Sequence, residues 1–179
     1  MIILFLGTPG AGKTTLAKFV SEKLNLPLID VGEILRRLAE QDPALAQEMN
    51  SGELADEGEV DRIVFTKIHD DDYNFILDGF PRTLTQAQAL THLLNEHGHR
   101  IDHVFEVTAP PELLKARILA RGRADDTEKV IDERLEIYDR ETRPVLDFLK
   151  TRDHKVIKLD NSGPLPDTEK ELRGSLNLH

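Results

Sequence analysis

The residues best suited to chemistry lie near the start of the chain. The run from Gly7 to Thr15 reads Gly-Thr-Pro-Gly-Ala-Gly-Lys-Thr-Thr and fits the pattern G-x-x-x-x-G-K-[ST] without a mismatch. Glycines let backbone N–H groups turn toward phosphate oxygens, and a following helix adds the positive end of its dipole. In such a loop Lys13 can reach the outer phosphates, and the Thr14 hydroxyl can bind Mg²⁺. The pattern predicts a site for a nucleoside triphosphate.

The segments on either side suit this loop. Residues 1–6 are apolar and typical of a short buried strand, and residues 16–24 place apolar side chains at helical spacing. The alternative is an ordinary glycine turn between a strand and a helix. The combination of strand, glycine loop and helix favours phosphate binding.

A carboxylate ends a second apolar segment. Residues 74–78 read Asn-Phe-Ile-Leu-Asp and are followed by Gly-Phe-Pro-Arg. An aspartate that closes a buried strand costs free energy unless it has a partner or a function. In a phosphate-loop fold Asp78 would orient Mg²⁺ and its waters. The alternative is that Asp78 caps the next turn.

Composition restricts the possible partners. The 179 residues carry 23 Lys and Arg against 33 Asp and Glu, a net charge of −10, which argues against general binding of nucleic acid or of an anionic membrane. There is no cysteine, which fits a reducing compartment. No apolar run reaches the length of a membrane span. We therefore expect a cytoplasmic protein in which a polyanionic ligand meets local clusters of arginine.

The alternation of elements predicts the fold. Five segments have strand character: 1–6, 26–30, 74–78, 101–107 and 155–159. Helical patterns separate them, including an acidic segment over 43–69 broken at 51–52, a helical region over 130–149 with a bend at Pro144, and a last helix over 168–176. This order predicts an α/β fold of the P-loop NTPase type, a single domain over 1–179 with a parallel five-stranded sheet and helices on both faces.

At this point the chain resembles the adenylate kinases of the nucleoside monophosphate kinase family. The block from Asp78 to Thr83, Asp-Gly-Phe-Pro-Arg-Thr, matches that family's most specific signature. Other matches follow in the expected order over nearly the whole chain: the glycine loop, Arg36, Gln86, the arginine series, Asp125-Asp126 and Tyr138…Thr142…Pro144. The resemblance implies a core of 1–30 and 74–179, a helical insertion over 31–73 that binds the monophosphate, and a vestigial lid at 121–126.

The resemblance implies the reaction ATP + AMP ⇌ 2 ADP with Mg²⁺, and a role for each matching residue. ATP would be bound by Gly7, Pro9, Gly10, Ala11, Gly12, Lys13, Thr14, Thr15, Arg117 and Arg121. AMP would be bound by Val31, Gly32, Arg36, Gly79, Arg82, Gln86, Arg123 and Arg134. The catalytic residues would be Lys13, Arg82, Arg121, Arg123 and Arg134, and Mg²⁺ would be held by Thr14 and, through water, by Asp78. Planar guanidinium groups suit the spread negative charge of a transferring phosphoryl group.

Two departures from the family pattern bear on function. Only residues 122–124 separate Arg121 from Asp125, so almost none of the usual lid is present. Val31 stands where adenylate kinases place a threonine that contacts adenine, and valine cannot form that hydrogen bond. Base selectivity is therefore expected to be loose, with a UMP/CMP or broad-specificity kinase as the alternative, although Gln86 favours adenine.

Two other functional classes are less compatible with the sequence. A GTPase would need D-x-x-G after a strand near the middle of the chain and an Asn-Lys-x-Asp base reader. The only D-x-x-G is at 160–163, and Asn-Lys-x-Asp is absent. The missing lid is the only feature that supports a non-catalytic nucleotide sensor. The full set of arginines argues against a sensor, because a protein that only binds nucleotide would not need all of them.

Overall fold

The computed structural model describes residues 1–52, 54–123, 126–152 and 154–178. Ala124 and Asp125, which belong to the predicted vestigial lid, lie outside these ranges. Five strands form one sheet: β1 (Ile2–Gly7), β2 (Leu28–Asp30), β3 (Phe75–Asp78), β4 (His103–Thr108) and β5 (Val156–Asp160). All pairs are parallel and the order is β2-β3-β1-β4-β5. The predicted five-stranded parallel α/β fold is confirmed.

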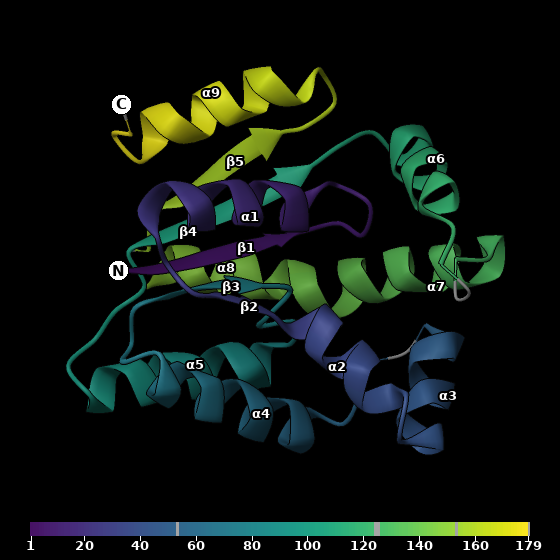
Figure 1. Ribbon diagram of the computed structural model, residues 1–179, viewed down its shortest axis with the longest axis horizontal. Coiled ribbons are helices and arrows are strands. Elements are labelled where there is room, and N and C mark those ends of the chain that lie inside the picture. The colour runs from purple at the N-terminus through teal and green to yellow at the C-terminus, as the bar shows by residue number, and fades with distance from the viewer. Residues whose placement is uncertain (53, 124–125, 153, 179) are drawn as a thin grey trace.

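The helices alternate with these strands. Their bounds are α1 (Lys13–Leu24), α2 (Val31–Ala39), α3 (Pro43–Ser51), α4 (Glu57–Asp70), α5 (Leu84–Glu96), α6 (Pro111–Arg121), α7 (Glu128–Ile137), α8 (Arg143–Thr151) and α9 (Leu165–Ser175). None of the helices in the described ranges is long and apolar enough to span a bilayer. In Figure 1, α2 and α3 project beyond the edge of the sheet that β2 forms.

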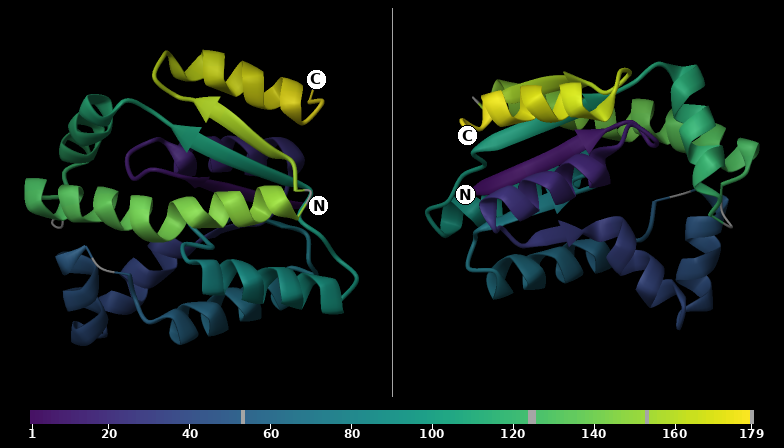
Figure 2. Two further views of the ribbon diagram at one scale, coloured as in Figure 1. Left: turned by 180° about the vertical axis from the view of Figure 1, so that it is seen from behind. Right: turned by 45° about the horizontal axis from the view of Figure 1, so that its top comes forward.

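The central strand shows why helices cover both faces. Side chains of a strand point alternately to opposite sides, and every residue of β1 is buried. Ile2, Leu4 and Leu6 join an apolar cluster with α4, α5 and α8, whereas Ile3 and Phe5 join another with α1 and α9. Figure 1 shows α1 in front of the sheet and α9 beside β5, and the view from behind in Figure 2 shows α7 and α8 crossing the other face.

Polar residues at helix starts set the bounds of the inserted helices. Asp30 accepts a hydrogen bond from the backbone N–H of Glu33 at the start of α2. Asp42 and Asp56 cap α3 and α4 in the same way, and α3 ends at Gly52 with a φ of 87°. Such caps satisfy N–H groups that have no partner within the helix. The predicted break at 51–52 is confirmed.

Two helical predictions differ from the structure. The bend expected at Pro144 takes the form of a π-helical turn, Tyr138–Thr142, in which the Arg143 N–H donates to the Tyr138 carbonyl. Proline lacks an N–H group and crowds the preceding turn, so a wider turn is a natural way to accommodate it. The last helix begins at Leu165 rather than at 168, with a proline in its first turn.

Candidate active site

A cavity of about 640 Å³ lies where strands β1, β2 and β3 end. Gly7, Asp30 and Asp78 close these three strands, and all three residues line the cavity. In open parallel sheets ligands bind at the carboxyl ends of the strands, because the loops that follow gather there. The geometry of the fold therefore brings the two motifs found in the sequence to one place.

The glycine loop is shaped by close backbone approaches. A Cβ at Gly7 would lie 2.0 Å from the carbonyl oxygen of Val107, and a Cβ at Gly12 would lie 2.5 Å from Asn161 Nδ2. Asn161 is buried and donates from Nδ2 to the Ala11 carbonyl at 2.7 Å, which ties the loop to the end of β5. No side chain in the described part of the chain caps the start of α1, and the first turn of this helix carries no acidic residue. This helix end is suited to an anionic ligand.

Lys13 folds back onto the loop that precedes it. Its Nζ donates to the carbonyls of Gly7 at 2.9 Å and of Thr8 at 3.0 Å. Burial lowers the pKa of the Lys13 ammonium from its usual 10.5 to about 8, and the attraction of Asp78 only partly opposes this effect. A phosphate group near Nζ would restore the stability of the charged form.

Thr14 and Asp78 face one another. The Thr14 hydroxyl donates a hydrogen bond to Asp78 Oδ2. Burial raises the pKa of the Asp78 carboxyl, while Lys13 and the Thr14 hydrogen bond act in the opposite direction. A hydroxyl and a carboxylate are oxygen ligands of the kind that Mg²⁺ prefers. The pair fits a magnesium ion, and a buried carboxylate gains from a nearby cation.

Arg82 is held by hydrogen bonds to its backbone and to the Nε of its side chain. Its Nε donates to the Gly79 carbonyl at 2.8 Å, its N–H donates to Gln86 Oε1 at 2.8 Å, and its carbonyl accepts from the Thr142 hydroxyl at 2.9 Å. Burial lowers the pKa of its guanidinium, against the opposing charge of Asp78. This arginine is held rigidly at the wall of the cavity, so an anion would meet a charge already in position.

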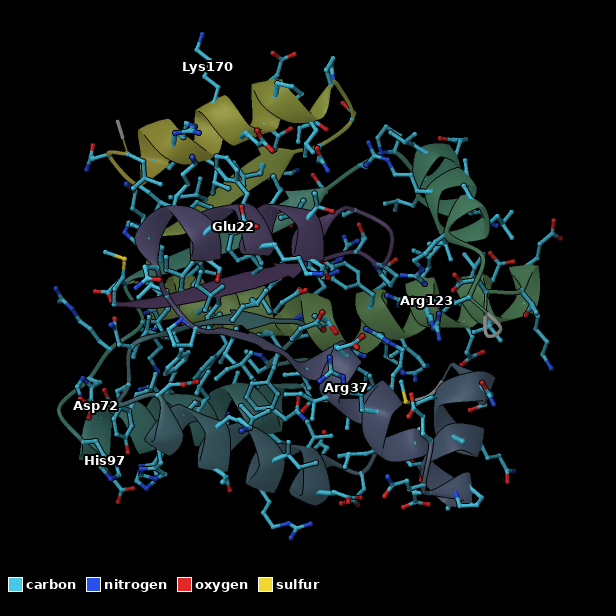
Figure 3. The ribbon with its side chains drawn as sticks, viewed as in Figure 1. Glu22, Arg37, Asp72, His97, Arg123 and Lys170 are labelled. Carbon is cyan, nitrogen blue, oxygen red and sulfur yellow. The ribbon has the colours of Figure 1, made fainter. Side chains whose placement is uncertain are left out.

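The first helix of the insertion contributes a second arginine. Arg36 lies on α2 and donates from Nη2 to Glu33 at 3.0 Å, and a Cβ at Gly32 would lie 3.2 Å from Arg36 Nη1. Its neighbour Arg37 is much more exposed and also pairs with Glu33. Arg36 lines the cavity, while Arg37, labelled in Figure 3, does not belong to the lining.

The far wall is formed by α6 and α7. Arg117 has a buried Nη1 without a hydrogen-bond partner among the described residues. Arg121 and Arg134 both bond to the carboxylate of Asp126. Figure 3 shows Arg123 at the connection between α6 and α7. All four arginines line the cavity.

The cavity is strongly positive in an acidic protein. Among the described residues its lining holds seven cationic side chains and two carboxylates. The cations are Lys13, Arg36, Arg82, Arg117, Arg121, Arg123 and Arg134, and the carboxylates are Asp30 and Asp78. Because the whole chain has a charge of −10, this concentration attracts a polyanion selectively at this point.

Comparisons with known proteins agree with this geometry. The family model described as "Adenylate kinase" matches residues 5–154. An adenylate kinase of Nocardia farcinica is 38% identical over 97% of this chain and 98% of its own. The adenylate kinase of Mycolicibacterium paratuberculosis is 42% identical over 84% of this chain and 86% of its own length. The adenylate kinase of Prochlorococcus marinus MIT 9301 is 41% identical over 83% of this chain and 84% of its own length. The chain belongs to the adenylate kinase family.

The family assignment confirms the resemblance and the enzyme class, while the roles of single residues stay predictions. Most of the adenylate kinase residues expected from the sequence line the cavity: Gly7, Pro9, Gly10, Gly12, Lys13, Thr14, Thr15, Gly32, Arg36, Asp78, Gly79, Arg82, Arg117, Arg121, Arg123 and Arg134. Three others lie outside its lining. Ala11 and Val31 are buried in the two apolar clusters, and Gln86 is buried with its Oε1 on the Arg82 N–H.

Sequence reasoning missed several residues of this adenylate kinase site. The end of α3 and the segment after it contribute four residues to the lining of the cavity, beside α7: Met49, Gly52, Leu54 and Ala55. Their only sequence signal is the helix break at Gly52. Asp126 belongs to the Asp125-Asp126 pair of the family pattern, but nothing in the sequence spacing of this pair shows that Asp126 bonds two arginines. Such contacts depend on how distant elements pack.

Proposed function

We propose that this chain catalyses the reversible, Mg²⁺-dependent transfer of the γ-phosphoryl group of ATP to AMP, which yields two molecules of ADP. The main support is the convergence of Lys13 and six arginines on one cavity beside the Thr14–Asp78 pair. Phosphoryl transfer needs alignment of donor and acceptor and neutralisation of spread negative charge, with little covalent help from the protein. The names of the relatives support the same reaction.

The glycine loop and α1 would bind the triphosphate of ATP. Backbone N–H groups and Lys13 would hold its outer phosphates, and Arg117 would lie against its base. The buried Nη1 of Arg117, which has no hydrogen-bond partner among the described residues, supports this role, because a buried donor gains a partner when a ligand enters. Mg²⁺, held by Thr14 and through water by Asp78, would neutralise charge on the phosphates when bound.

The opposite side of the cavity would bind AMP. Arg36 and Arg82 would hold its phosphate, and Gln86 would contact its base from the start of α5. Arg121, Arg123 and Arg134 would surround the transferring group. In this proposal residues 31–73 are the monophosphate-binding segment, residues 121–126 replace the lid, and the enzyme acts in the cytoplasm.

The direct test mixes purified protein with ATP, AMP and MgCl₂ and follows ADP by ³¹P NMR. We expect rapid formation of ADP without release of inorganic phosphate only when all three are present, since any ADP formed without AMP would come with phosphate from hydrolysis. The matched variants are Lys13→Met, which should abolish transfer, and Lys18→Met, an exposed lysine on the same helix, which should not change it. A folded parent protein that binds ATP but forms no ADP would contradict the proposal and favour a nucleotide sensor. Repeating the assay with UMP, CMP and GMP measures acceptor selectivity.

A further inference from the structure

A second cavity, of about 430 Å³, lies at the opposite end of the sheet from the active site. It is bordered by the end of α5 and by the segments that lead into β4 and β5, whereas the active-site cavity lies where β1, β2 and β3 end. In Figure 1 the arrowheads of β1, β4 and β5 point toward α6, so the starts of these strands lie at the far end of the sheet. The described linings of the two cavities have no residue in common. We call the second one the rear cavity.

The charge of the rear cavity is opposite to that of the whole chain. Its lining includes the cations Arg100, Arg152 and Lys155 and a single carboxylate, Asp102. This count refers to the described residues, which do not include Asp153. Because the chain carries 23 Lys and Arg against 33 Asp and Glu, an excess of cations is not the ordinary state of its surface. A hollow with clustered cations concentrates anions from solution.

The three cations keep their donors for a ligand. None of them forms an ion pair with a described residue. The guanidinium of Arg152 lies over the Phe148 ring, 5.2 Å from its centroid, a contact that restricts the guanidinium plane without using its N–H groups. The carboxylate of Asp102 is partly occupied, because its Oδ2 accepts from the Ile2 N–H at 2.7 Å and so joins the starts of β1 and β4.

The size and polarity of the rear cavity restrict the kind of ligand. Arg100 comes from the segment before β4, while Arg152 and Lys155 come from the segment before β5, so cations border the cavity from two parts of the chain. The volume lies within the range of small-molecule sites, roughly 300–1,000 Å³. Ile101 is the only apolar residue in the described lining and is itself buried, so a nucleobase or an acyl chain would have little to pack against. The amide of Asn95 adds a neutral donor from α5.

We propose that the rear cavity binds a small hydrophilic molecule with two or more phosphate groups, such as pyrophosphate or a sugar bisphosphate. Arginine side chains form two-point contacts with phosphate oxygens, and Lys155 would add a compact charge. A phosphate monoester carries about −1.5 to −2 charges at neutral pH, so it gains more from these cations than a carboxylate does. The inference is independent of the proposed kinase reaction, because it concerns residues outside the active-site cavity.

The test is a ¹H–¹⁵N NMR titration of the full chain with pyrophosphate, with the active-site cavity filled by saturating AMP and a non-hydrolysable ATP analogue. We expect saturable shifts of the amide signals of Ile101, Asp102 and Lys155. Orthophosphate should bind about tenfold more weakly, because it reaches fewer of the cations and one exposed ion pair is worth up to about fivefold in affinity. Fructose 1,6-bisphosphate, titrated in the same way, distinguishes an organic bisphosphate from an inorganic one. Tighter binding of either supports the proposal and identifies the source of the phosphate groups.

Variants locate the binding to this cavity. The double substitution Arg152→Gln, Lys155→Gln should weaken pyrophosphate binding by about tenfold. The matched control is Lys150→Gln, Lys158→Gln, which removes the same charge from exposed lysines of α8 and β5 outside the lining and should change the affinity by less than about twofold. Asp102→Asn removes the carboxylate charge and should tighten binding, a result that a damaged fold could not produce.

Three results would overturn the inference. The first is the absence of saturable shifts at Ile101, Asp102 and Lys155 in the parent protein. The second is equal weakening in both double variants, which would mean that only the net charge of the chain matters. The third is tighter binding of a hexa-aspartate peptide than of pyrophosphate at the same amides, which would indicate a site for acidic peptides instead.

Discussion

The hydroxyl of Thr14 donates a hydrogen bond to the carboxylate of Asp78, although the two residues are 64 positions apart in the chain. Thr14 lies in the first turn of α1, and Asp78 is the last residue of β3. The contact is made possible by the parallel pairing of β1 with β3, which aligns Phe5 with Asp78 at the same edge of the sheet. It joins the glycine loop to the Asp-Gly-Phe-Pro-Arg block.

This contact leads to a prediction about magnesium. Thr14→Ala removes the hydroxyl and should raise the Mg²⁺ concentration needed for half-maximal ADP formation by about tenfold or more, the usual size for loss of a group that holds or orients a metal ligand. Thr14→Ser keeps the hydroxyl and should stay close to the parent. The measurement is initial rate against free Mg²⁺ at saturating nucleotide. If the rate depended on Mg²⁺ concentration equally in all three proteins, the assignment of Thr14 to the metal site would be wrong.

A second prediction concerns the proton on Lys13. Because its pKa in the ligand-free protein is about 8, the side chain is about half neutral at pH 8. A bound triphosphate favours the charged form, so the Lys13 contribution to proton uptake on ATP binding should be a fraction of a proton at pH 8 and almost none at pH 6.5. Calorimetry of the ATP complex in buffers of different ionisation enthalpy measures this uptake. Lys13→Met should abolish it, whereas Lys18→Met should not.

The same residue affects stability. The folded-state pKa of Lys13 lies below its unfolded value of 10.5, so the unfolded chain binds more protons between pH 8 and pH 10.5. The contribution of Lys13 to the free energy of unfolding should therefore rise with pH in this window, by at most about 1.4 kcal/mol per pH unit. Urea unfolding at several pH values, compared with Lys13→Met, isolates this contribution. A difference between the two proteins that does not change with pH would contradict it.

The sequence predicts local structure and the residues at strand ends well. The glycine loop and Asp78 follow buried strands, and parallel pairing brings all such strand ends to one edge. Contacts made across the cavity are not predictable in this way. Asp126 between two arginines, and Met49 against Arg134, depend on how α3, α6 and α7 pack together. Sequence spacing carries no information on that packing.

Val31 illustrates the same limit. The resemblance to adenylate kinases implies a residue near the base of AMP at this position, whereas in the structure the Val31 side chain is buried, at 2% exposure, within the apolar cluster around β3. If the base of AMP contacts this position, Val31→Thr should increase the preference for AMP over UMP and CMP by about a factor of two to ten. This is the effect on affinity expected from one added hydrogen bond. The measurement is kcat/KM for each acceptor. Val31→Ala, which loses packing but gains no hydroxyl, is the control, and equal selectivity in both variants would rule out the contact with the base.

The last prediction concerns the side of the cavity where α3 meets α7. The end of α3 lies directly against α7: Arg134 donates to the Met49 carbonyl, and a Cβ at Gly52 would lie 3.3 Å from both Val130 Cγ1 and the Val130 carbonyl oxygen. Both Gly52 and Met49 line the cavity. We expect this contact to reduce the access of water from that side. Exclusion of water limits hydrolysis of the transferring group.

Gly52→Ala should push α3 away from α7 and increase ATP hydrolysis in the absence of AMP, with a higher KM for AMP. The new methyl group meets Val130, and the φ of 87° disfavours any side chain there. Gly98→Ala is the matched control, because Gly98 has a φ of 74° and a Cβ there would meet none of the described residues within 4 Å. The free energy of unfolding should fall by about 1 kcal/mol in both variants, because a side chain at a positive φ strains the backbone. Only Gly52→Ala should raise the ratio of hydrolysis to transfer, and an equal ratio in both variants would show that the α3–α7 contact does not shield the phosphates.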